Sequence, residues 1–187
     1  MNKYNFIFTL LIGTLLPTAC NSNSDNPDPY GSLEVNLDKA LILELINNHR
    51  AEGVTCGNQE REAVAPLVWN DQLAQAALDH SNDMQQNDYF SHTGLDGSSH
   101  GQRAKRAGYT GSPVSENIAS GQRSEERVVE AWMQSEGHCK AIMREGITEI
   151  AIARSNEGNY WTLLTGKGSD QSQQILTHTT VVSSESD

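Results

Sequence analysis

The chain has 187 residues, which suits a single domain, since domains commonly span about 100–200 residues. Hydrophobic residues make up 36% of the chain and charged residues 20%. The aliphatic residues and the three Trp are enough to form a hydrophobic core, which argues against a wholly disordered chain. Asp and Glu number 24 against 13 Lys and Arg, and the net charge of −11 disfavours a nucleic-acid binder because it repels phosphate. No run of 18 apolar residues occurs, so the sequence predicts no ordinary membrane-spanning helix.

Residues 1–19 have the composition of a signal peptide. Lys3 supplies a positive charge, and residues 6–16 form an apolar stretch of 11 residues, which is too short to span a bilayer. Small residues then precede Cys20, as at the acylation site of bacterial lipoproteins, although Pro17 departs from that pattern. We therefore expect export, either as a cell-envelope lipoprotein acylated at Cys20, with the outer membrane allowed, or as a secreted protein. An uncleaved anchor is the third interpretation.

The composition divides the rest of the chain into three parts. Residues 20–36 are rich in Asn, Ser, Asp and Pro and are predicted to form a polar tether. Residues 37–168 contain the periodic apolar segments and are predicted to form the folded domain, without internal repeats. Residues 169–187 are rich in Ser, Gln and Thr and are predicted to form a disordered polar tail.

Four helices are predicted, each from a capping residue followed by apolar positions at helical spacing. The second is the clearest, because apolar residues recur at positions 73, 76, 77 and 84 along one face. Glycines are expected to end the other three, since glycine favours the backbone conformation after a helix. The helices are predicted to begin after Asn36, Asn70, Ser98 and Ser124, and three of them to end at Gly53, Gly108 and Gly137.

Three extended segments complete the predicted domain. Residues 147–154 alternate in polarity, the turn at 156–159 contains Gly158, and residues 160–165 follow as the second strand of a hairpin. A further extended piece is expected near 114–119. Helices together with an antiparallel sheet indicate the α+β class.

Two cysteines remain besides Cys20. Cys56 follows the first predicted helix and Cys139 follows the fourth, and an even pair in an oxidising compartment predicts a disulfide. Two buried free thiols are the alternative.

The six histidines fall into different settings. His92 and His138 lie in turn-like segments, a setting that by itself indicates no function. The others are expected to be packed on helices (His49 and His80), exposed in a Ser/Gly-rich stretch (His100), or in the tail (His178).

Seven segments between residues 37 and 168 resemble, in order and spacing, the CAP superfamily of cysteine-rich secretory, antigen 5 and pathogenesis-related 1 proteins, in its bacterial SCP-like branch. The resemblance implies a three-layer α-β-α sandwich with a central antiparallel sheet and a large cleft. The segments are Asn48-His49-Arg50, LVWNDQLAQAALDHSNDM at 67–84, YFSHTGLDGSS at 89–99, AGY at 107–109, ENIASG at 116–121, AWMQSEGHCKAIM at 131–143 and YWTLLTG at 160–166.

In that family the cleft holds a tetrad of two His and two Glu. The resemblance assigns His92, Glu116 and His138 to three of these positions. The fourth is uncertain, because Ser135 stands where better-known members have Glu. Glu136 is our candidate for it, and Glu130 is the fallback.

Two neutral imidazoles, His92 and His138, can bind Zn²⁺ or another divalent cation weakly, with water in the open positions. Nearby carboxylates would orient the rings. A polar cleft without metal is the alternative, and hydrolysis by a metal-bound water is the third possibility. The chain contains neither the His-Glu-x-x-His nor the Gly-x-Ser-x-Gly motif, which disfavours zincin and serine-hydrolase mechanisms.

The sequence therefore favours an exported, non-enzymatic binding module whose His/Glu cleft takes a divalent cation, with lipid as a further ligand implied by the family. A metal-dependent or Ser/His hydrolase, either protease or nuclease, is one alternative. An envelope scaffold or adhesion module that contacts a surface protein is the other.

Overall fold

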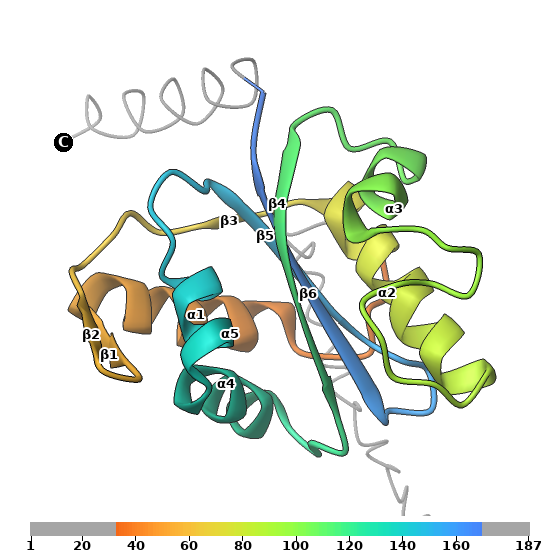
Figure 1. Cartoon of the computed structure of the whole chain (residues 1–187), viewed down its shortest axis with the longest axis horizontal. Helices are drawn as coiled ribbons and strands as arrows, with labels where there is room; N and C mark the ends of the chain where they lie inside the picture. The colour runs from red at the N-terminus through yellow and green to blue at the C-terminus, as the bar shows by residue number, and fades with distance from the viewer. Residues whose placement is uncertain (1–32, 170–187) are drawn as a thin grey trace, which may run out of the picture.

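The computed structural model describes residues 33–169, which form three layers. Figure 1 shows α1 (Lys39–Glu52), α4 (Glu125–Gln134) and α5 (Glu136–Ile142) on one side of a sheet. The helices α2 (Asp71–Gln86) and α3 (His100–Arg106) lie on the other side. The predicted α+β fold with an α-β-α sandwich is thus confirmed.

The sheet has four strands in the order β3 (Val68–Trp69), β5 (Glu149–Arg154), β6 (Tyr160–Lys167) and β4 (Ser112–Ser120). The β5–β6 hairpin and the β4–β6 pair are antiparallel, as expected. However, β3 pairs with β5 in parallel, so the prediction of an antiparallel sheet is corrected to a mixed one.

Alternation along β5 explains how one strand serves two cores. Ile150 and Ile152 pack with α1, α4 and α5, whereas Ala151 and Ala153 pack with α2 and α3. Successive side chains of a strand point to opposite faces, so larger residues fill one face and small ones admit α2 closely on the other.

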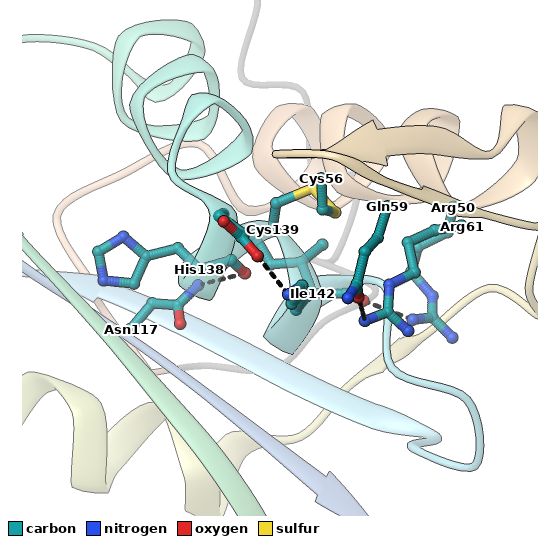
Figure 2. The surroundings of a disulfide bond; sticks show 10 residues. Arg50, Cys56, Gln59, Arg61, Asn117, His138, Cys139 and Ile142 are labelled. Atoms are coloured by element: carbon teal, nitrogen blue, oxygen red, sulfur yellow. Dashed lines mark hydrogen bonds and ion pairs between the residues drawn. A yellow bond between two sulfur atoms is a disulfide. The ribbon is translucent and has the colours of Figure 1, made fainter.

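A disulfide between Cys56 and Cys139 joins α5 to the small hairpin of β1 (Val54–Cys56) and β2 (Gln59–Arg61), which confirms the predicted pairing (Figure 2). The buried Arg50 guanidinium adds a second attachment, since it donates hydrogen bonds to the carbonyls of Ala65, Ile142 and Arg144. The disulfide and the Arg50 hydrogen bonds together fix the position of α5.

Some predicted helix boundaries are wrong by a few residues. Asp38, not Asn36, caps α1, because Asn36 has a φ of 54° and lies before the helix. Ser99, not Ser98, caps α3. Ser135 ends α4 and begins α5, so Gly137 lies inside a helix rather than after one.

The folded domain begins earlier than residue 37. Val35 is buried and its carbonyl accepts a hydrogen bond from Arg154 N, and the Asn36 side chain donates to Ser155 O at 2.7 Å.

Within residues 33–169, no helix combines the length and apolar character needed to cross a membrane. The predicted signal peptide, Cys20, most of the tether and nearly all of the tail, with His178, lie outside the described residues.

Candidate functional site

His92 lies in the loop between α2 and α3, with 58% of its side chain exposed. Its Nδ1 is 2.9 Å from Oε1 of Glu116, whose side chain is only 1% exposed on β4. A carboxylate that already forms an ion pair accepts hydrogen bonds, so Nδ1 carries the proton and donates. In the neutral ring, Nε2 of His92 then carries no proton and keeps its lone pair.

Arg103 completes this arrangement from α3. Its Nη2 is 2.5 Å from Oε2 of Glu116 and 3.1 Å from the carbonyl oxygen of His92, and its Nη1 donates to Ser98 O. One buried guanidinium therefore holds both the carboxylate that orients His92 and the backbone that carries His92. No motif in the sequence predicts that Arg103 contacts Glu116.

His138 is half-buried in the first turn of α5. Burial lowers its pKa, and the charge of His92 lowers it further. Asn117, next to Glu116 on β4, donates to the His138 carbonyl at 3.2 Å (Figure 2). Adjacent residues of β4 thus tie the two histidines to one strand.

His100 is a third imidazole near the site, although we expected it to be exposed. It is half-buried, and burial lowers its pKa, with a raising contribution from Glu116 and lowering contributions from Arg103 and His92. The sequence held a usable signal: the Ser99–Gln102 capping box sets the start of α3 and puts His100 and Arg103 three residues apart, on one helix face.

The two proposed second carboxylates are both exposed and paired with a cation on their own helix. Glu136 is 55% exposed and forms an ion pair with Lys140, one turn along α5. Glu130 is similarly exposed and pairs with Arg127 at 3.1 Å. Within residues 33–169, no three His, Cys, Asp or Glu side chains are grouped as a metal site. The structure thus pairs His92 with Glu116 and links the backbone of His138 to Asn117, the next residue of β4, whereas Glu136 and Glu130 pair with cations on their own helices.

The expected packing of His80 is found, since it is 1% exposed on α2. Its Nε2 lies 2.9 Å from Ser91 O, next to His92 in the loop. The hydroxyl of Ser91 accepts a bond from Thr93 N and so stabilises the turn.

Acidification is expected to destabilise the protein partly through His80. Burial lowers the pKa of His80, so below its ordinary value of about 6.5 the unfolded state binds the proton more readily. The stabilising contribution is complete above about pH 6.5 and declines as the pH falls toward the folded-state pKa. His80→Gln, which keeps a donor for Ser91 O, should reduce the stability lost between pH 7.5 and 5.5 by up to about 1 kcal/mol in urea unfolding. An unchanged loss, or an equal effect of the control His49→Gln, would contradict this.

The comparisons with known proteins concern the family and the fold. Residues 43–167 match the sequence profile described as CAP: Cysteine-rich secretory protein family. The uncharacterized protein YkwD of Bacillus subtilis is 34% identical over 145 residues, which cover 78% of this chain and 52% of YkwD. The chain thus spans about half the length of this curated relative.

Two solved structures have similar folds. An extracellular protein containing a SCP domain from Bacillus anthracis aligns with a TM-score of 0.60 and 26% identity, over 69% of this chain and 40% of that one. An outer surface protein of Borrelia burgdorferi aligns with a TM-score of 0.53 and 23% identity, over 71% and 97%, and supports the fold alone. With the family profile matching more than half of the residues, the chain belongs to the CAP, or cysteine-rich secretory protein, family.

Proposed function

We propose that this chain is an exported binding domain that holds a divalent cation such as Zn²⁺ weakly between His92 and His138. The observation that carries the proposal is the 2.9 Å contact between Glu116 and Nδ1 of His92. Metal-binding histidines commonly donate their second N–H to a carboxylate, which fixes the tautomer and aims the free nitrogen. Glu116 supplies that orienting partner, and Arg103 holds it in place.

The state of His138 also fits a ligand. Because burial lowers its pKa, its ring is neutral at neutral pH and keeps a lone pair for a metal. Two protein ligands leave the remaining positions of a Zn²⁺ ion to water or to oxygen atoms of a bound partner. The affinity should therefore be modest, and a lipid headgroup or a surface protein could complete the coordination.

The same geometry favours binding over hydrolysis. A metal-dependent hydrolase needs a carboxylate able to take a proton from the metal-bound water. Glu116 is already engaged by Arg103 and His92, and Glu136 and Glu130 pair with cations on their own helices. We therefore rank the binding role ahead of the protease or nuclease alternative.

Export is supported by the disulfide, since such bonds persist in oxidising compartments. The similar Bacillus anthracis protein is described as extracellular. Attachment to a cell-envelope membrane through acylated Cys20 remains part of the proposal, and secretion is its alternative.

A calorimetric Zn²⁺ titration of the purified chain at pH 7.5 tests the cation site. We expect one saturable event that disappears in His92→Ala/His138→Ala and that weakens as the pH is lowered, because a histidine must be deprotonated to bind a metal. His49→Ala, which removes an imidazole from α1, is the matched control and should bind as the parent does. Absent binding, or equal binding by the double variant with its circular dichroism unchanged, would overturn the proposal.

A further inference from the structure

The disulfide lies beside one of the two proposed cation ligands. Cys139 bonds to Cys56 and directly follows His138 in α5 (Figure 2). Both cysteines are fully buried, whereas His138 is half-buried. Neighbouring residues of a helix point about 100° apart around its axis, so the Cys139 sulfur and the His138 ring leave α5 in different directions. The disulfide therefore acts on the imidazole through the backbone of the helix.

The first turn of α5, which carries His138, is held less firmly by hydrogen bonds than the last turn. The helix has seven residues, and isolated helices shorter than about 12–15 residues are marginal in water. Its N-cap residue, Ser135, makes no side-chain capping bond. Arg50 donates to two carbonyls at the far end, whereas Asn117 donates a single 3.2 Å bond to the His138 carbonyl. The first turn therefore depends on the covalent attachment at its last residue.

The other side of the disulfide is the β1–β2 hairpin, which is a two-stranded sheet separate from the central one. Each of its strands has three residues, and an isolated hairpin is at best marginally stable. Its turn packs against the first turn of α5, since a β-carbon at Gly57 would lie 2.7 Å from Cδ of Glu136. The Cys56–Cys139 bond thus fastens together two small elements, neither of which is stable by itself.

His92 is held by contacts that do not involve the disulfide. Its Nδ1 donates to Glu116, and Arg103 binds both that carboxylate and the His92 carbonyl from α3. The two proposed ligands therefore have separate supports, a buried ion pair for His92 and the disulfide for His138. Metal affinity requires both imidazoles to be fixed in advance, so loss of either support should weaken binding.

We propose that formation of the Cys56–Cys139 bond completes the cation site only after export, an inference that rests on the proposed function of His92 and His138. In the reducing cytoplasm the two thiols stay free, and the turn that carries His138 is not fixed. Outside it, thiol–disulfide exchange transfers two electrons and two protons from the thiols to a disulfide donor, which leaves as a dithiol. Because both cysteines are fully buried, the folded domain then shields the bond from reductants. The chain would thus not capture zinc before export.

Calorimetric Zn²⁺ titration of the full chain tests the proposal. Cys56→Ala/Cys139→Ala represents the reduced state without free thiols, which would themselves bind zinc. We expect it to bind Zn²⁺ about tenfold or more weakly than the oxidised parent, and His138→Ala to do the same. Combining the three substitutions should add little, because both changes act through one ligand. Leu73→Ala, which leaves a cavity on the α2 side of the sheet, lowers stability without touching α5 and should bind as the parent does.

An NMR comparison without zinc gives a second readout that does not depend on the cation. ¹H–¹⁵N spectra and amide hydrogen exchange are recorded for the oxidised parent and for the parent reduced with a phosphine. We expect shifted signals and faster exchange at residues 54–61 and 135–143. The 87–99 loop, which carries His92, should keep its signals, since its support lies elsewhere in the fold.

Several results would overturn this inference and leave the cation site standing. These are equal Zn²⁺ affinity of the parent and the cysteine variant, an equal loss in Leu73→Ala, and fully additive losses when His138→Ala is combined with the cysteine substitutions. Unchanged spectra on reduction, or unfolding of the whole domain, would also overturn it, because neither outcome leaves a local element for the bond to fix. If the oxidised parent binds no zinc, the proposed function itself fails, and the role of the disulfide in completing the site fails with it.

Discussion

Reduction of the Cys56–Cys139 bond is expected to lower the free energy of unfolding by about 4–5 kcal/mol. The two cysteines are 83 residues apart, so the bond closes a long loop in the unfolded chain. In the chain-entropy model, the conformational freedom regained by a loop of that length amounts to about 4–5 kcal/mol. The bond also joins α5 to the β1–β2 hairpin, and both cysteines are fully buried in the larger core. Urea unfolding with and without a thiol reductant measures the difference.

The matched control is the Cys56→Ser/Cys139→Ser variant, whose stability should be low and insensitive to reductant. Arg50 is retained in that variant, and its bonds to Ile142 O and Arg144 O still attach the end of α5 to α1. A native circular-dichroism spectrum before urea is added would show that the fold survives. A loss below about 1 kcal/mol on reduction would mean that the bond adds little constraint to the unfolded chain.

The elements that sequence reasoning located well are those with strong local signals. Asn70 caps α2 as predicted, and one face of that helix is buried over its whole length. The hairpin of β5 and β6 follows from alternation and from a turn with Gly158 at a φ of 79°. Such features depend on residues near one another in the chain, so a single sequence reveals them.

The missed elements are short and depend on distant partners. β3 consists of only Val68 and Trp69, and it is a strand because β5 lies parallel beside it. Gly137 is typical of a residue that ends a helix, so the sequence does not predict α5, although Ser135 separates α4 from α5 in the structure. The two residues of β3 carry no periodicity, and the seven of α5 form only about two turns, so tertiary contacts decide the conformation of both.

At the candidate site, too, residues within sequence motifs could be predicted, whereas a residue whose role depends on contacts distant in sequence could not. The family resemblance predicts His92, Glu116 and His138 as site residues and leaves the second carboxylate open. Glu136 and His138 are two residues apart on α5, which separates them by about 200° around the helix axis. The Glu136 carboxylate therefore projects from a different side of α5 than the His138 imidazole does. Arg103 has no motif of its own, and only the fold shows that it contacts Glu116.

Glu116→Ala is expected to destabilise the protein by about 3–5 kcal/mol, because it leaves the Arg103 guanidinium buried without its partner. Arg103→Met should also be destabilising, since it leaves the Glu116 carboxylate buried. The double variant Glu116→Ala/Arg103→Met should cost less than the sum of the two, because no uncompensated charge then remains. Urea unfolding of all four proteins gives the coupling free energy directly.

Glu130→Ala provides the matched control, because its ion pair with Arg127 is exposed and should contribute at most about 1 kcal/mol. The role of Glu116 in orienting His92 needs a different measurement. Glu116→Gln accepts from His92 less strongly than a carboxylate does, and it should weaken Zn²⁺ binding about 10–100-fold while the chain remains folded. Zinc affinity unchanged in folded Glu116→Gln would show that Glu116 serves only to neutralise Arg103. The buried ion pair would then be a structural feature independent of His92.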